Sequence, residues 1–284
     1  MSSNDQWVTE YFESAGLSFG LRSKGKLHEE QTQFQKLEIF DTEPFGKLMV
    51  LDGANMVSTL ENFLYHEMMS HPALFTHAQP KHVAIIGGGD CGTLREVLKH
   101  PGIEKVTQID IDEGVTRASL KYFPELCDSN NDPRAELLFD DGLKWMRERE
   151  ADSLDIVIID STDPVGPAEG LFAVDFYRDC FRALRLGGVI VQQTESPILH
   201  TESIIKKVHT DMRAVGFNSV ATLPFPQPIY PSGWWSCTMA GKFTNVKHFR
   251  REEAAQKQFK TRYYNAGIHE GALHLPEFMK EILG

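Results

Sequence analysis

The chain has 284 residues, of which 41% are hydrophobic, which is enough apolar material for one large domain or for a small domain beside a medium one. Its formal net charge of −11 argues against nucleic acid and against an anionic membrane as partners, and it favours a cationic ligand. No apolar run approaches the ~18 residues of a membrane span, and the start MSSNDQWVTE lacks signal-peptide features, so a cytoplasmic protein is expected.

The first predicted elements are short strands. Extended runs broken by turn signals fill residues from about 19 to 60, and the alternation in FQKLEIF and the Asp52-Gly53 pair predict hairpins. A small antiparallel β region therefore comes first. Residues 61–77 carry a helical period that Pro72 interrupts, which predicts a linker helix.

After Pro80 the pattern changes to strands that alternate with helices. The strand-like runs are HVAIIG, VTQID, AELLF, DIVIID and GGVIVQQ, and amphipathic stretches such as CGTLREVLKH and DFYRDCFRALRL lie between them. This alternation predicts a mostly parallel sheet covered on both faces, closed by two antiparallel strands near the C-terminus. We expect an α/β protein with an N-terminal β-hairpin domain and linker helix over residues 1–77 and a second domain over residues 78–284.

Metal and disulfide chemistry are not expected. The four cysteines are widely spaced and form no C-x-x-C pair, so buried thiols are favoured over a zinc site or a disulfide framework. His66 and His71 resemble a zinc-protease motif, but five residues place them about 140° apart around a helix, so they cannot share a metal.

Acidic side chains follow one strand of the predicted sheet after another. The carboxyl ends of parallel strands meet at one edge, where open sheets bind their ligands, so these side chains should converge on one cleft. Capping or turn formation is the better explanation of any one of them alone, and the succession is what indicates a site. In chain order they are Asp90, Asp110 with Asp112, Asp140 with Asp141, and Asp160 with Asp163, and Gln193 ends the fifth strand.

The loop IIGGGDCGTLREV indicates the class of ligand. It supplies glycines where the backbone can approach a ligand closely, and it lacks the Gly-Lys-Ser/Thr of a nucleoside triphosphate loop. The glycines are Gly87, Gly88, Gly89 and Gly92. Asp110 follows roughly twenty residues later, at the end of the next strand, where a carboxylate can accept from both ribose hydroxyls. A bound nucleoside is therefore predicted.

Asp90 narrows the choice of nucleoside. It lies in the glycine turn, where it would repel the pyrophosphate of a dinucleotide, whereas a sulfonium compound avoids that conflict. At an effective dielectric near 20, a carboxylate about 4 Å from a cation gains roughly 4 kcal/mol before desolvation. Adenosylmethionine has a carboxylate on its tail, which Asp90 would oppose, so a decarboxylated tail with a free propylamine fits better. The acidic cleft could then accept a second cation.

An ordered set of motifs, spread nearly end to end, resembles the spermidine synthase family of polyamine aminopropyltransferases. The motifs are GKLMVLDG, YHEMMSHPAL, IIGGGDCGTLREVLKH, IDID, DPR, DDG, DSTDPVGPAEGLF, QQTESP, YPSGWW and RYYNAGIH. The resemblance implies a small N-terminal β domain, a Rossmann-like, methyltransferase-type catalytic domain, and a homodimer or homotetramer. It also implies transfer of the propylamine group from decarboxylated S-adenosylmethionine to putrescine, which gives spermidine and methylthioadenosine. The sulfonium compound is then a co-substrate, and no other cofactor is expected.

The resemblance assigns roles residue by residue, with Asp160 as the base. The implied amine-binding residues are Tyr65, His66, Asp90, Ser161, Thr162, Asp163, Gln193, Tyr230 and Trp235. The implied nucleoside-binding residues are Gln35, Gly87, Gly89, Asp110, Ile111, Asp141, Gly142 and Pro167.

Some positions depart from the family pattern and leave the acceptor open. Met56 replaces a glutamine near the substrates, and Glu61-Asn62 replaces an acidic pair. Cadaverine or agmatine is the alternative acceptor. A small-molecule methyltransferase and a catalytically silent polyamine or nucleoside sensor are the alternative functions. The loop at 164–170 suits either a lid or an ordinary connection.

Overall fold

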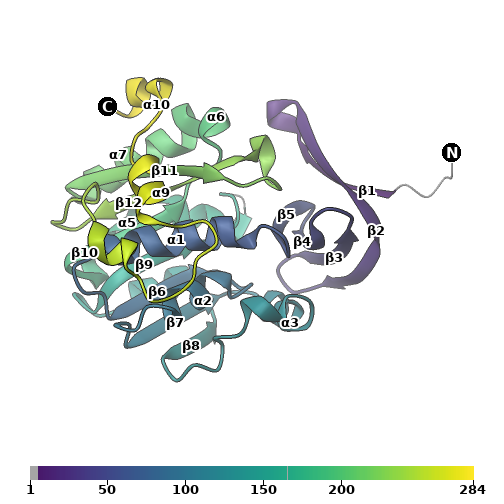
Figure 1. Ribbon diagram of the computed structural model, residues 1–284, viewed down its shortest axis with the longest axis horizontal. Coiled ribbons are helices and arrows are strands. Elements are labelled where there is room, and N and C mark those ends of the chain that lie inside the picture. Colours follow the sequence, from purple (N-terminus) through teal and green to yellow (C-terminus); the bar gives the residue numbers. More distant parts are fainter. Residues whose placement is uncertain (1–5, 165) are drawn as a thin grey trace.

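The computed structural model describes residues 6–164 and 166–284, which form two separate sheets (Figure 1). The smaller sheet is antiparallel, and its strands are neighbours in chain order. They are β1 (Gln6–Phe12), β2 (Leu17–Gln31), β3 (Lys36–Thr42), β4 (Gly46–Leu51) and β5 (Ala54–Ser58). The β4–β5 connection is the predicted Asp52-Gly53 hairpin, in which both residues have positive φ, 49° and 89°.

The sequence did not predict the strand β1. Its alternation is inverted, since Trp7 and Tyr11 are 57% and 72% exposed whereas Glu10 is only 5% exposed. A strand that places aromatic residues outward and a carboxylate inward does not match the pattern of a half-buried strand. The inversion turns the Glu10 carboxylate toward the interior of the protein.

The larger sheet has the order β11-β12-β10-β9-β6-β7-β8. Its strands β10, β9, β6, β7 and β8 run parallel, and β12 pairs antiparallel with both β10 and β11, as expected from the sequence. The strands are β6 (His82–Gly87), β7 (Lys105–Asp110), β8 (Ala135–Phe139), β9 (Leu154–Asp160), β10 (Leu184–Gln193), β11 (Ser219–Pro226) and β12 (Trp234–Gly241).

Helices cover both faces of this sheet, which is the predicted Rossmann-like α/β arrangement. They are α1 (Asn62–Thr76), α2 (Gly92–Leu98), α3 (Glu113–Tyr122), α4 (Gly142–Arg147), α5 (Val174–Ala183), α6 (Pro197–His200), α7 (Lys206–Val215), α8 (Arg251–Ala255), α9 (Ala266–Ala272) and α10 (Glu277–Leu283). Short segments of 3₁₀ or π helix lie at Glu13–Ala15, Pro124–Leu126, Gly166–Phe172, Thr201–Ile205 and Pro231–Gly233. No helix of the described residues is long and apolar enough to cross a membrane.

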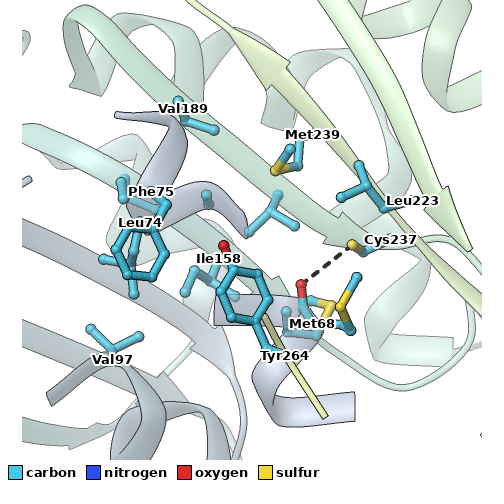
Figure 2. Close-up of a cluster of buried hydrophobic side chains, with 14 of the residues drawn as sticks. Met68, Leu74, Phe75, Val97, Ile158, Val189, Leu223, Cys237, Met239 and Tyr264 are labelled. Atoms are coloured by element: carbon cyan, nitrogen blue, oxygen red, sulfur yellow. Dashed lines mark hydrogen bonds between the residues drawn. The ribbon is translucent and has the colours of Figure 1, made fainter. Parts of the chain in front are cut away.

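Alternate residues of each central strand enter different cores. Ile85 packs with side chains of α1 and α2, whereas Ile86 packs with side chains of α4, α5 and α7. Because both faces of the sheet are covered, the sequences of these strands are continuous apolar runs. Figure 2 shows part of the first core, where Phe75 of α1 and Val97 of α2 lie beside Ile158 of β9.

The helix predicted over residues 61–77 is present as α1 (Asn62–Thr76), but two of its features differ from the expectation. Pro72 does not interrupt α1, and nearly all of α1 is buried against the larger sheet rather than bridging two units. A proline inside a helix leaves the carbonyl four residues earlier without its N–H partner. That carbonyl is on Met68, and the Cys237 thiol donates to it at 3.6 Å (Figure 2), so the helix continues through the proline.

Glu67 fixes the C-terminal segment to α1. This carboxylate is 1% exposed and accepts the backbone N–H groups of Arg262, Tyr263 and Tyr264 at 2.8, 2.9 and 2.7 Å. Three charge-assisted bonds on one buried carboxylate satisfy backbone donors that have no other partner in a strand or helix.

We predict that Glu67→Gln lowers the free energy of unfolding by about 2–3 kcal/mol, because the amide offers one acceptor oxygen and turns its NH₂ toward backbone donors. Urea unfolding at one fixed protein concentration measures this loss. Glu202→Gln is the matched control, since the Glu202 side chain is 69% exposed and forms a surface ion pair with Lys206, and it should change stability by less than about 0.5 kcal/mol. Equal losses of stability in the two variants would contradict the role of Glu67 in holding residues 262–264.

Candidate active site

A cavity of about 440 Å³ lies at the carboxyl ends of the parallel strands, which is within the usual size range for small-molecule sites. Its walls come from the N-terminal sheet, from α1, and from the loops after β6, β7, β8 and β9. A smaller cavity of about 30 Å³ adjoins it, and Met56, Tyr65 and Tyr230 line both.

The glycine loop after β6 is shaped by contact with β9. Gly87 has φ +85°, and a Cβ there would lie 2.1 Å from the backbone oxygen of Asp160. Gly88 N–H donates to that same oxygen at 2.8 Å. A Cβ on Gly89 would lie 2.8 Å from an Asp110 carboxylate oxygen. The glycines therefore let the ends of three strands approach each other around the cavity.

Asp160 presents its carboxylate to two hydroxyl donors. Tyr65 donates to Oδ1 at 2.7 Å, and Thr93 donates to Oδ2 at 2.6 Å. Burial raises the pKa of Asp160, and the negative charge of Asp90 adds to the rise. The two hydroxyl bonds oppose it, because they stabilise the ionised carboxylate.

Asp90 is paired with a buried histidine. His66 Nε2 lies 2.9 Å from Asp90 Oδ2, and Gly92 N–H donates to Oδ1 at 2.8 Å. Burial by itself would raise the pKa of Asp90, but the charge and the hydrogen bond of His66 outweigh burial, so this pKa is lowered. Burial acts on His66 in the downward direction, and Asp90 overcomes it, so the pKa of His66 is raised.

The acids at the ends of β7 and β8 divide between the cavity and helix caps. Asp110 lines the cavity, and burial raises its pKa to about 6. Asp112 instead caps α3 by accepting from Gly114 N–H at 2.9 Å, and Gln35 donates to its other oxygen at 2.9 Å. Asp141 both lines the cavity and caps α4, whereas the neighbouring Asp140 lines neither cavity.

Two carboxyl groups that the sequence did not single out lie at the smaller cavity, Glu10 in its lining and Glu195 next to its lining residues Asp163 and Gln193. Glu10 reaches it from β1, and burial raises the pKa of Glu10 to about 7 although Asn55 N–H donates to it at 3.1 Å. Glu195 is 1% exposed, and burial together with the charge of nearby Asp163 raises its pKa well above the usual value. The carboxyl groups of Glu10, Asp163 and Glu195 thus lie close enough for their charges to interact.

Every predicted site residue whose side chain the structure describes lines one of the two cavities. The larger cavity is lined by Gln35, Tyr65, His66, Gly87, Gly89, Asp90, Asp110, Ile111, Asp141, Gly142, Asp160, Ser161, Thr162, Asp163 and Tyr230. Gln193 and Trp235 line the smaller one, where Trp235 Nε1–H donates to Gln193 at 3.2 Å. The side chain of Pro167 lies outside the described part of the structure.

Sequence reasoning missed three residues at the site, namely Glu10, Thr93 and Glu195. The inverted alternation of QWVTEYF was the available signal for Glu10, since it sets a carboxylate on the inward face. Thr93 follows directly after the glycine loop, and Glu195 stands in the motif QQTESP, but neither position carries a local signal for what it touches.

A mostly parallel sheet, a glycine loop after its first strand, and a cavity at the strand ends define a Rossmann-like α/β protein that binds its ligand at the carboxyl ends of its strands. Profiles of two families match the chain. The spermine/spermidine synthase domain matches residues 62–249, and the spermidine synthase tetramerisation domain matches residues 6–61.

Individual relatives agree with the profiles. Polyamine aminopropyltransferases from Thioalkalivibrio sulfidiphilus and Xanthomonas campestris are 59% and 60% identical over 100% of this chain and 99% and 100% of their own. Two solved structures, each 34% identical, cover 100% of this chain and 96% of theirs. They are a spermidine synthase in complex with the transition state analogue AdoDATO, with a TM-score of 0.94, and the spermidine synthase from Thermotoga maritima, with a TM-score of 0.92. The chain belongs to the spermine/spermidine synthase family of aminopropyltransferases, which confirms the resemblance seen in the motifs.

We predict that Gly87→Ala destabilises the protein by about 3 kcal/mol or more, because its Cβ would collide with the backbone of Asp160 as well as straining φ. Gly53→Ala is the matched control, since Gly53 also has positive φ, +89°, but nothing lies within 4 Å of its added Cβ. Urea unfolding of Gly53→Ala should show a loss of only about 1 kcal/mol in the free energy of unfolding. If Gly53→Ala lost as much stability as Gly87→Ala, strain in φ rather than contact with β9 would explain why residue 87 is a glycine.

Proposed function

We propose that the chain transfers the aminopropyl group of decarboxylated S-adenosylmethionine to putrescine, giving spermidine and methylthioadenosine, with Asp160 as the base. The observation that supports this most strongly is the charge of the two cavities. Carboxylates line them from end to end, and their described linings contain no lysine or arginine. Such a surface favours a ligand that carries several positive charges.

The nucleoside end of the larger cavity suits an adenosyl group. Asp110 lies there as an acceptor for ribose hydroxyls, between the glycine loop and Gln35. Ile111 supplies an apolar surface, and Gly142 at the start of α4 packs closely on Ile86, since a Cβ there would lie 2.6 Å from the Ile86 side chain. We infer that decarboxylated S-adenosylmethionine is a co-substrate that binds here, and that the reaction uses no other cofactor.

Asp90 favours an amine over a carboxylate in the tail of this co-substrate. His66 already occupies Asp90 Oδ2, and the pKa of Asp90 is lowered, so the carboxylate carries its charge at neutral pH. A second carboxylate beside it would be repelled, whereas the ammonium of a decarboxylated tail would be attracted.

The acceptor amine fits between Asp160 and the smaller cavity. Its reacting nitrogen would lie at Asp160 and Tyr65, and its chain would pass along Tyr230 and Met56, which line both cavities. Its distal ammonium would then reach the carboxylates of Glu10, Asp163 and Glu195. A cation there relieves the repulsion among these acids, which suits a diamine of putrescine's length.

The reaction needs a neutral nitrogen. With the lysine pKa of ~10.4 as a guide, deprotonation at pH 7 costs about 4.6 kcal/mol. The nitrogen lone pair forms the new N–C bond as the C–S bond breaks, the sulfonium becomes a thioether, and Asp160 accepts the proton released from nitrogen. Orientation of the two substrates and exclusion of water supply much of the remaining acceleration.

The N-terminal sheet supports assembly into a homo-oligomer. Residues 6–61 match a tetramerisation domain, and β1 presents Trp7 and Tyr11 outward. Aromatic residues exposed on an edge strand are suited to an interface. We infer a homotetramer in preference to a homodimer.

Product analysis tests the proposal. We expect methylthioadenosine and spermidine from decarboxylated S-adenosylmethionine with putrescine, and slower reaction with cadaverine, agmatine or spermidine, all measured by mass spectrometry. A different best acceptor would retain the chemistry and reassign the substrate, with Met56 as the first residue to test. Turnover of intact S-adenosylmethionine with methyl transfer would establish a methyltransferase instead, and binding without turnover would establish a sensor.

Asp160→Asn is the control variant for the base. It should lower kcat by about 10²–10⁴ and leave methylthioadenosine affinity nearly unchanged, because the amide cannot accept the proton but keeps the shape of the site. Full turnover by Asp160→Asn would remove Asp160 from the role of base.

A pH dependence follows from Glu10, whose pKa of about 7 reflects burial. Below pH 7 Glu10 is neutral, and a cation bound beside it favours the ionised form, so binding must release a proton. The KM for putrescine, at saturating co-substrate, should therefore fall about tenfold between pH 6 and pH 8. Glu10→Gln should flatten this dependence, and Glu13→Gln, at an exposed position, should retain it. An equal slope in all three proteins would exclude Glu10 from the acceptor site.

A further inference from the structure

We propose that Thr93 positions the base of the reaction by holding one carboxylate oxygen of Asp160. This inference rests on the proposed role of Asp160 and adds a residue to it. Thr93 is the second residue of α2, it is fully buried, and it lines neither cavity. It contacts Asp160 from outside the two cavities, so it acts on the substrates only through Asp160.

The geometry leaves the carboxylate little freedom. Thr93 donates to Oδ2 at 2.6 Å from α2, while Tyr65 donates to Oδ1 at 2.7 Å from α1. An ionised carboxylate is acceptor-only, so both hydroxyls must direct their single protons toward it. With one donor on each oxygen, the remaining lone pairs keep a fixed direction, and one of them can face the cavity. A base held in one orientation reacts faster than one that rotates.

Packing between α1 and α2 fixes the position of the Thr93 hydroxyl. Gly92, the preceding residue, lies so close to the His66 ring that a Cβ would come within 2.2 Å of it. On the other side, the Ser70 hydroxyl donates to the Thr93 carbonyl at 3.5 Å. Thr93 therefore cannot follow Asp160 if the carboxylate turns, and it constrains the carboxylate instead.

Thr93 also counters the electrostatics of the site. Burial and the charge of Asp90 both favour a protonated Asp160, and a protonated carboxyl cannot accept a proton from the amine. The titratable groups that face Asp160 from other elements are Tyr65 and His66 of α1, Asp90 of the glycine loop, Asp110 of β7, and Tyr230 before β12. Among these neighbours the acids raise the pKa of Asp160, and the Thr93 hydroxyl works with Tyr65 and His66 to lower it.

Two substitutions separate this role from packing. Thr93→Val keeps the shape but loses the hydroxyl, whereas Thr93→Ser keeps the hydroxyl but loses a methyl group. We expect Thr93→Val to move the acid limb of the kcat/KM profile for the acceptor upward by about one pH unit or more, because one bond to the ionised form is lost. Activity should fall at neutral pH and recover as pH rises, and Thr93→Ser should keep the acid limb of the parent enzyme.

The opposite ranking of the two variants would overturn the inference. If Thr93 only packs between helices, Thr93→Ser would be the worse variant, each variant would lose activity by a factor that does not change with pH, and the acid limb would not move. Methylthioadenosine affinity, measured by calorimetry, should be the same in Thr93→Val as in the parent, since Thr93 lies outside the nucleoside cavity. Weakened nucleoside binding in Thr93→Val would indicate general damage to the site and would also count against a positioning role.

Asp160→Asn distinguishes failure of this inference from failure of the proposed function. If Asp160→Asn retains turnover, Asp160 is not the base and the role of Thr93 falls with it. If Asp160→Asn is inactive and Thr93→Val has the parent pH profile, the inference about Thr93 alone is wrong. In the Asp160→Asn background, Thr93→Val should cause no further loss, because both substitutions act on one interaction.

Discussion

The gathering of more carboxylates than cationic partners is the constraint on which the site depends. Asp90, Asp160, Asp163 and Glu10 line connected cavities whose described walls hold no lysine or arginine. Burying like charges together costs free energy, and the protein limits that cost with hydroxyl and N–H donors and by raising the pKa of several acids. The negative charge that remains uncompensated would favour the binding of a polycationic ligand at this site.

The first helix links this electrostatic arrangement to the rest of the fold. Successive residues of α1 serve different partners: Tyr65 contacts Asp160, His66 contacts Asp90, and Glu67 holds the backbone of residues 262–264. A helix can do this because consecutive side chains point about 100° apart. The C-terminal segment, Asp90 and Asp160 are thus all held by α1, and the Cys237 thiol donates to the Met68 carbonyl that Pro72 leaves without its helical partner.

Most of the fold and much of the site were predictable from local patterns. Strand and helix periods, turn residues and acids at strand ends depend on neighbours in sequence, so the parallel sheet, the Asp52-Gly53 hairpin and the convergence of Asp90, Asp110 and Asp160 could be inferred. The continuity of α1 through Pro72 could not be inferred in this way. Whether a proline breaks a helix depends on a donor supplied from elsewhere, here a thiol on β12 that is distant in sequence.

Motif order alone was sufficient to identify the family, because glycine loops and clustered acids keep their spacing along the chain. The partners of those acids were a matter of three-dimensional contact. Glu10 lies on a strand whose polarity is inverted, and it meets Asp163 and Glu195 only because the small sheet folds over the edge of the large one. Thr93 meets Asp160 only because α2 packs beside β9 across 67 residues of sequence. Hydrogen bonds and charge repulsion act over a few ångströms in space, whatever the separation along the chain.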